Sequence, residues 1–390
     1  MNIPLRQTGL AYRGIIILVL ASGSFNGIAG VALASATPAI AQHFTAGGQG
    51  IFLAQLILVA PALSIILGSP LANMLGRLIG PRRLLLGALA LYVLAGLFPL
   101  FTPDFVPVII SRLVLGGASS LISTLALAQA GGMPHETRYK LIGFGTALAS
   151  LASITSIIAA GWLAGKFGWQ AACLVYIWPL PLLPAFFAMP AAAPGPVQTQ
   201  VKEGMAPYLT VAPLFLLTIL WSAVMFAPSI AGPFLLAARG MDNPAIIGLV
   251  MGGTGLIAAG ASALYGWVAR LLDFNGQILL VFTLFFIAAV IIVLASTVGL
   301  TEAGLVFTGM ASGLIAPSLV TMIIHRVEVR HIATAMGLFT SMIYTSQLLD
   351  PFLFQGMKAV LRLSPFTAIM LICAGGIAAS LPRAIRTAVR

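Results

Sequence analysis

Long apolar runs separated by short polar breaks form the pattern of hydrophobic and polar positions from one end of the chain to the other. Each run is about 20 residues long, the length that an α-helix needs to cross roughly 30 Å of hydrocarbon. The repeated runs predict a chain that crosses a membrane many times. Because backbone exposed to lipid must satisfy its own hydrogen bonds, every crossing is expected to be helical.

Glycine, proline and charged residues between the runs predict about twelve membrane-spanning helices. In the first half of the chain the expected spans are 14–36, 51–71, 83–101, 105–129, 141–165 and 171–189. In the second half they are 210–237, 245–268, 277–296, 303–324, 334–357 and 365–381. The first run exceeds the apolar core of a usual signal peptide, so we count it as a span although Ala34-Ser35-Ala36 resembles a cleavage site.

Residues 190–207 read PAAAPGPVQTQVKEGMAP and form a polar, proline-rich stretch that is typical of a linker. The stretch predicts two bundles of six helices, one over residues 1–189 and one over residues 208–390. We expect the linker to be cytoplasmic.

The two halves resemble each other at an offset of about 193 residues. Arg77 and Arg270 end corresponding spans, and Gly116 corresponds to Gly309. Parallel repeats of six spans that face each other across a central cavity are a known transporter arrangement.

Composition supports a membrane protein, since 60% of the residues are hydrophobic and only 7% are charged, against about a quarter in a soluble domain. The net charge of +11 follows from basic residues between the apolar runs and at the C-terminus, so it indicates topology and not nucleic acid. If the N-terminus is cytoplasmic, fourteen basic residues lie on the cytoplasmic side: Arg6, Arg13, Arg77, Arg82, Arg83, Arg138, Lys140, Lys202, Arg270, Arg326, Arg330, Arg383, Arg386 and Arg390. The other side holds four: Lys166, Arg239, Lys358 and Arg362. This bias predicts that both termini face the cytoplasm.

Two motifs carry a family resemblance. Residues 73–83, NMLGRLIGPRR, resemble the loop between the second and third helices of the major facilitator superfamily, with matches at Leu75, Gly80, Arg82 and Arg83. Arg77 stands where that loop has an aspartate, so the acid that usually makes its gating contact is replaced. Residues 112–118, RLVLGGA, resemble the arginine and glycine-rich face of the family's fourth helix.

The resemblance covers nearly the whole chain and implies an all-α integral membrane fold. It implies two six-helix bundles related by a pseudo-two-fold axis along the membrane normal, and transport by alternating access. It also implies that Arg77, Gly80, Arg82, Arg83 and, in the second repeat, Arg270 belong to gating loops. The fifth span has Ser156 and Ile157 where drug–proton antiporters of the family have Gly-Pro.

Arg112 lies about seven residues into the fourth span, where burial of a guanidinium costs several kcal/mol unless it faces a partner or water. By resemblance it would bind an anionic group or couple transport to protons. The alternative is that Arg112 reaches the outer surface or caps neighbouring carbonyl groups.

Asp350 is the acidic residue that lies well inside a predicted span, roughly 10 Å from the outer end of the eleventh. A carboxyl group at that depth suits a proton carrier. The alternative reading uses Pro351, because Asp-Pro is a favourable N-cap and N1 pair for a helix that breaks and restarts.

Four further residues are candidates for a solute cavity. Tyr344 and Gln347 lie on the face of the eleventh span that leads toward Asp350. Asn26 in the first span and Trp221 in the seventh lie at mid-membrane depth, and the resemblance implies that these two helices line the cavity. For Asn26 and Trp221 the alternative is contact between helices.

Catalytic and cofactor chemistry is not expected. His43, His135, His325 and His331 fall in loops or at helix ends, Cys173 and Cys373 lie in separate apolar runs, and no phosphate-binding glycine loop occurs. No metal, cofactor or nucleic acid is therefore predicted, and the driving force is expected to be an ion gradient.

The leading hypothesis is proton-coupled efflux of a small amphipathic or drug-like solute by a monomer in the cytoplasmic membrane. An uptake symporter or a facilitated exchanger of an organic anion paired with Arg112 is the alternative. A membrane enzyme or a receptor that does not transport is a distant third, because no catalytic constellation is present. Protons or another ion, the solute and the lipid bilayer are the expected partners.

Overall fold

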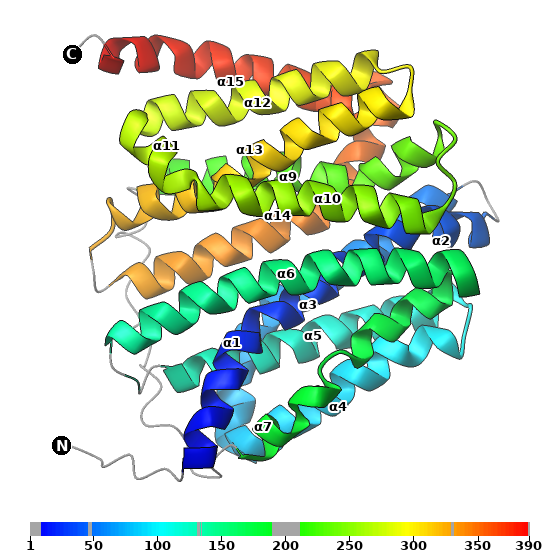
Figure 1. Ribbon diagram of the computed structural model, residues 1–390, viewed down its shortest axis with the longest axis vertical. Helices are drawn as coiled ribbons and strands as arrows, with labels where there is room; N and C mark the ends of the chain where they lie inside the picture. The colour runs from blue at the N-terminus through cyan, green and yellow to red at the C-terminus, as the bar shows by residue number, and fades with distance from the viewer. Residues whose placement is uncertain are drawn as a thin grey trace. The chain divides into compact units, whose positions relative to one another are not determined.

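The computed structural model describes residues 9–45, 49–130, 133, 135–188, 211–328 and 331–388, and these residues form helices joined by short connections (Figure 1). Eleven stretches of the described chain are long and apolar enough to cross a membrane. They coincide with eleven of the predicted spans. The remaining one, predicted at 334–357, is the helix α14 (Ile332–Leu361), whose Thr, Ser, Gln and Asp residues lower its mean hydropathy. The chain is an all-α, multi-pass integral membrane protein.

Residue proximity divides the chain into two compact units, unit 1 with Met1–Leu33 and Leu56–Thr199, and unit 2 with Ala34–Gln55 and Gln200–Arg390. The predicted linker 190–207 lies outside the described residues. The division into bundles of residues 1–189 and 208–390 stays a prediction.

Unit 1 contains α1 (Gly9–Val31), most of α3 (Gly50–Ile79), α4 (Pro81–Leu97), η2 (Phe98–Leu100), α5 (Phe105–Ala130), α6 (His135–Phe167), η3 (Trp169–Ile177), η4 (Leu180–Leu182) and α7 (Leu183–Ala188). Unit 2 contains α2 (Thr37–His43), the start of α3, α9 (Ala212–Ala237), α10 (Pro244–Ala263), α11 (Tyr265–Leu271), α12 (Phe274–Leu294), α13 (Val298–Ile324), α14 and α15 (Pro365–Ala388). The short η1 (Ala32–Ala36) crosses the boundary between them.

Local sequence explains where several helices begin. Asn243, Asp273 and Thr297 precede α10, α12 and α13, and each side chain accepts a hydrogen bond from a backbone N–H of the first turn. These caps satisfy donors that a helix start leaves free. Gly80 has a positive φ of 89°, which a glycine adopts without strain, and it turns the chain directly into α4.

The sixth span differs from its prediction. A single helix was expected over 171–189, whereas the structure has the 3₁₀ helices η3 and η4 followed by the short α7. Pro179, Pro181 and Pro184 fall within this stretch. Because proline has no N–H to donate, these residues interrupt the α-helical hydrogen-bond ladder after η3. They do not explain η3 itself, which ends at Ile177, before the first of them.

The internal repeat is visible in how helices pair inside each unit. The pairs α1–α5, α1–α6 and α4–α5 in unit 1 correspond to α9–α13, α9–α14 and α12–α13 in unit 2. Gly116 of α5 lies so close to the carbonyl oxygen of Pro61 that a Cβ would collide with it. A Cβ on Gly309 of α13 would likewise lie 2.7 Å from the carbonyl oxygen of Thr254. Gly116 corresponds to Gly309, and Pro61 corresponds to Thr254, at the predicted offset of about 193 residues.

Candidate functional site

Arg112 is completely buried in unit 1, seven residues after the start of α5 at Phe105. Its Nη2 donates one hydrogen bond of 3.1 Å to the carbonyl oxygen of Ala29 in α1 and one of 2.7 Å to the hydroxyl of Tyr176 in η3. The guanidinium carbon also lies 4.9 Å from the centre of the Tyr176 ring, a distance at which cation–π attraction adds to the hydrogen bonds. Arg112 therefore lies in the interior of unit 1 and does not reach the outer surface.

The positive charge of Arg112 has no carboxylate partner in the described part of unit 1. Asp104 is exposed just before α5. Nε and Nη1 of Arg112 are buried and have no hydrogen-bond acceptor among the described residues. Only Nη2 of Arg112 caps a carbonyl group, so the alternative reading accounts for one of the three guanidinium nitrogens. A buried guanidinium with two unused donors is suited to an anionic or strongly accepting ligand.

Aromatic side chains that the sequence did not single out extend from this charge through Tyr176. The ring of Tyr176 lies 5.9 Å from that of Tyr92, and Phe25 lies 5.1 Å from Tyr92 and 4.9 Å from Trp178. Trp178 Nε1 donates a 3.4 Å hydrogen bond to the Tyr92 hydroxyl. We call Arg112, Tyr176, Tyr92, Trp178 and Phe25 the Arg112 cluster. The sequence signal that could have found this cluster was a tyrosine within an apolar run, because a buried hydroxyl needs a polar partner.

Asp350 is completely buried in unit 2, and neither carboxylate oxygen has a hydrogen-bond donor among the described residues. The alternative reading as a cap is wrong, because α14 continues through Pro351 without a break. Asp350 is also deeper than predicted. The helix runs on to Leu361, eleven residues or about 16 Å beyond Asp350.

The neighbours of Asp350 on α14 are only partly polar. Gln347, one turn before Asp350, is buried, and Tyr344 is half-buried. Ser346 donates a 2.9 Å hydrogen bond to the carbonyl oxygen of Ile219, which ties α14 to α9. Tyr344 and Gln347 thus precede Asp350 on α14 at helical spacing, and of the three only Tyr344 is partly exposed.

Trp221 and Asn26 are placed differently from each other. Trp221 of α9 is completely buried and packs edge-to-face on Phe282 of α12, with the ring centres 5.7 Å apart. Its Nε1 has no acceptor among the described residues. Asn26 of α1 is half-buried, and its buried Oδ1 has no donor there.

The predicted gating residues lie at helix ends. Arg77 is two residues before the end of α3, and Arg270 is one residue before the end of α11, so the two arginines hold corresponding places. The side chain of Arg77 lies outside the described residues. Gly80 forms the turn into α4, Arg82 is half-buried, and Arg83 and Arg270 are exposed.

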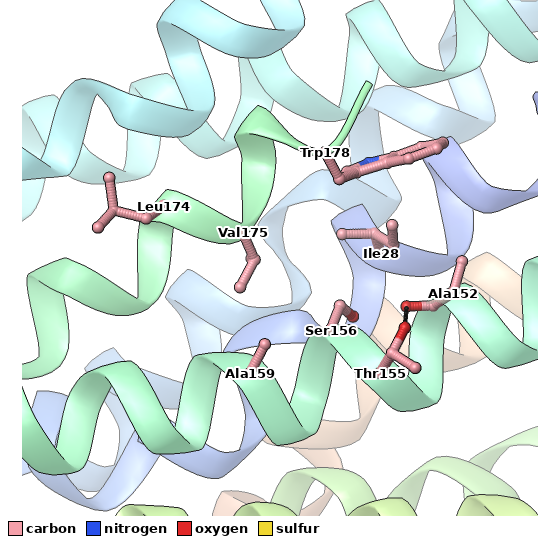
Figure 2. Close-up of a pocket in the computed structure, with 8 residues that line it drawn as sticks. All are labelled: Ile28, Ala152, Thr155, Ser156, Ala159, Leu174, Val175 and Trp178. Carbon is pink, nitrogen blue, oxygen red and sulfur yellow. Dashed lines mark hydrogen bonds between the residues drawn. The ribbon is translucent and has the colours of Figure 1, made fainter. Parts of the chain in front are cut away.

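A pocket of about 340 Å³ opens in unit 1 beside the Arg112 cluster. Figure 2 shows Trp178 over one end, Ile28 of α1 below it, and Thr155, Ser156 and Ala159 along α6. Among the described residues, no three or more His, Cys, Asp or Glu side chains lie close enough together to hold a metal ion.

Comparison with known proteins gives a family model and solved structures. The model described as Major Facilitator Superfamily matches residues 16–349. No curated protein sequence matches the chain. The crystal structure of a D-xylose–proton symporter is similar with a TM-score of 0.74 at 14% identity, over 95% of this chain and 96% of that one. Two structures of the nucleoside transporter NupG, one of them a point mutant, give TM-scores of 0.66 and 0.68 at 11% identity, over 97% of this chain and 98% and 99% of theirs.

Proposed function

The chain belongs to the major facilitator superfamily, and from that premise we propose that it is a proton-coupled secondary transporter of a small organic solute in which Asp350 carries the proton. The observation behind this proposal is the placement of Asp350. The side chain is completely buried in α14, which covers the predicted span 334–357, and both carboxylate oxygens lack a donor in the described structure.

A lone buried carboxylate is costly, and protonation removes the charge. If one side of the membrane protonates Asp350 and the other accepts the proton, the conformational change that moves the solute is coupled to the pH gradient. The other acidic side chains of unit 2 that the structure describes are exposed or half-buried, so none of them shares the placement of Asp350.

The test is transport into proteoliposomes with an imposed pH gradient. Asp350→Asn cannot exchange a proton at physiological pH, so accumulation driven by the gradient is expected to fall to the level without a gradient. Counterflow, which needs no net proton movement, is expected to survive. Asp242→Asn is the matched control, because Asp242 is exposed in the connection between α9 and α10. Full accumulation by a folded Asp350→Asn protein would remove the proton role.

We propose export of amphipathic compounds as the direction, since the four cavity candidates combine two aromatic side chains, Tyr344 and Trp221, with two neutral amides, Asn26 and Gln347. Uptake in symport fits the same placement of Asp350, and a D-xylose–proton symporter is among the similar structures. Accumulation measured with the pH gradient imposed in each orientation distinguishes export from uptake.

A second candidate function is exchange of an organic anion at Arg112. It is favoured by the two guanidinium nitrogens that have no acceptor among the described residues. Counterflow of small mono- and dicarboxylates tests it. Arg112→Gln is expected to abolish that counterflow, whereas Arg326→Gln, at an exposed arginine, is expected to keep it. Equal rates in the two variants would exclude an anion role for Arg112.

We further propose that the protein acts as a monomer in the cytoplasmic membrane with both termini inside. The excess of Lys and Arg residues on the cytoplasmic side supports the orientation of the termini. Cysteines introduced at Gly47, which lies outside the described residues, and at Arg386 test the orientation. An impermeant thiol reagent is expected to label them from opposite sides of the membrane. Labelling from the same side would refute the arrangement.

A further inference from the structure

The pocket of unit 1 is bounded by α1, α6 and the residues of η3 and its C-terminal end. Its volume of about 340 Å³ lies at the lower end of ligand pockets, which span about 300–1,000 Å³. No charged side chain lines it. Val175 and Ile28 supply aliphatic walls, and Trp178 supplies an aromatic face (Figure 2).

The polar side chains of the wall already have partners. Thr155 Oγ1 donates to the carbonyl oxygens of Leu151 at 2.9 Å and Ala152 at 3.1 Å, and Ser156 Oγ donates to that of Ser153 at 2.7 Å. Trp178 Nε1 is used by Tyr92. A ligand with many hydrogen-bonding groups would lose its hydration here and find no free side-chain donor. The wall is therefore complementary to a neutral, apolar occupant.

The pocket lies at mid-length of a candidate membrane span. Its wall residue Thr155 is the midpoint of the span Gly143–Phe167, twelve residues from either end. Twelve residues of helix correspond to about 18 Å. Hydrocarbon chains are the chemical groups that surround a protein at this depth.

The pocket wall is continuous with an exposed apolar stripe of α6. Leu148, Leu151 and Trp162 are between 44% and 51% exposed. Together with Thr155 and Ala159 they are spaced three or four residues apart along α6. Such residues share one face of a helix. Where hydrocarbon meets this face of unit 1, a chain lying along the stripe can enter the pocket without leaving the bilayer.

We propose that this pocket binds the acyl chain of a bilayer phospholipid, inserted from the exposed face of α6 against Trp178. The site is separate from Asp350, and it does not depend on which solute is transported. Trp178 provides the reporter, because its ring lines the pocket and is held by Phe25 and Tyr92.

The experiment measures indole fluorescence in bilayers of phospholipid with bromine atoms at mid-chain, because bromine quenches an indole that it contacts. The other tryptophans are first changed to phenylalanine: Trp162, Trp169, Trp221 and Trp267. Brominated lipid is expected to quench Trp178. Ala159→Leu, which fills the pocket, is expected to reduce that quenching at least twofold. Ala147→Leu is the matched control, because Ala147 is exposed on α6 outside the pocket wall.

Equal quenching in the Ala159→Leu and Ala147→Leu proteins would overturn the proposal, as would no quenching in either. Brominated free fatty acid in an unbrominated bilayer tests the source. Quenching by the fatty acid with none by the phospholipid would also overturn it. If the protein with a single tryptophan does not fold, the part of the quenching that Trp178→Phe removes from the otherwise native chain is compared between the Ala159→Leu and Ala147→Leu proteins.

Discussion

The two units follow the same plan of helix pairs, yet each buries an ionisable side chain where the other has an aliphatic one. At the offset of about 193 residues, Arg112 of α5 corresponds to Leu305 of α13, and Asp350 of α14 corresponds to Ile157 of α6. Leu305 and Ile157 are buried as well. The repeat therefore does not need a charge at either position for its packing.

The two charges are also held differently. Arg112 is fixed by the Tyr176 hydroxyl, the carbonyl oxygen of Ala29 and the face of an aromatic ring. Asp350 has no such partner in the described structure. The difference is that three contacts hold Arg112 in one orientation, whereas no described side chain or backbone group orients the carboxylate of Asp350.

The largest expected effect comes from giving each unit the aliphatic residue of the other. Arg112→Leu and Asp350→Ile should leave the melting temperature unchanged or raised, because a poorly paired buried charge does little for stability. Transport should nevertheless fall, by roughly 100-fold for Arg112→Leu if two bonds of about 1.5 kcal/mol to solute are lost. Thermal unfolding and proteoliposome transport measure the two quantities. A lower melting temperature with normal transport per folded molecule would mean that the charges are structural.

The next largest effect tests whether the units share their packing. Gly116→Ala and Gly309→Ala should each lower the free energy of unfolding by about 3 kcal/mol, because a Cβ meets the backbone of the neighbouring helix. Gly87→Ala in α4 is the control, since no atom lies within 4 Å of its Cβ position. Thermal unfolding in detergent gives the values. Destabilisation by only one of the first two would show that the repeat is not matched at this contact.

A smaller effect sharpens the contrast in how the charges are held. Tyr176→Phe removes the hydroxyl that accepts from Arg112 but keeps the ring, so transport should slow by about tenfold, as expected for one bond to a charged group. Tyr92→Phe, which loses only the 3.4 Å bond from Trp178, should be nearly neutral. Initial rates as a function of solute concentration separate binding from turnover. Equal rates in the two variants would show that the Tyr176 hydroxyl does not position Arg112.

The smallest effect concerns the hydrogen bond that joins α14 to α9, the helix pair that corresponds to α1–α6 in unit 1. Ser346→Ala should cost about 1 kcal/mol, because it removes the bond to the carbonyl oxygen of Ile219. Ser341→Ala should cost less, since that hydroxyl bonds within its own helix. Unfolding followed by intrinsic fluorescence measures both. A cost for Ser341 equal to that for Ser346 would contradict a role of this bond in joining the helices.

Sequence reasoning reached the spans, the repeat and the two buried charges. It could do so because an apolar run of membrane length and a charge within it are local features of the chain. It misjudged the sixth span, which begins as the 3₁₀ helix η3 and continues through three prolines into η4 and α7, and it left open a helix break at Pro351 that does not occur. Whether a proline ends a helix depends on neighbours that compensate for the missing bond, and these are not written in the local sequence.

The sequence by itself therefore determined a many-span, all-α membrane protein of the major facilitator superfamily, since length, hydropathy and motif spacing are properties of one chain segment at a time. Only the tertiary structure decided which side chains surround each charge. Tyr176 is 64 residues from Arg112, and Ala29 is 83 residues away. Contacts at such separations depend on how helices pack, because the identity of each partner follows from the rotation and depth of both helices.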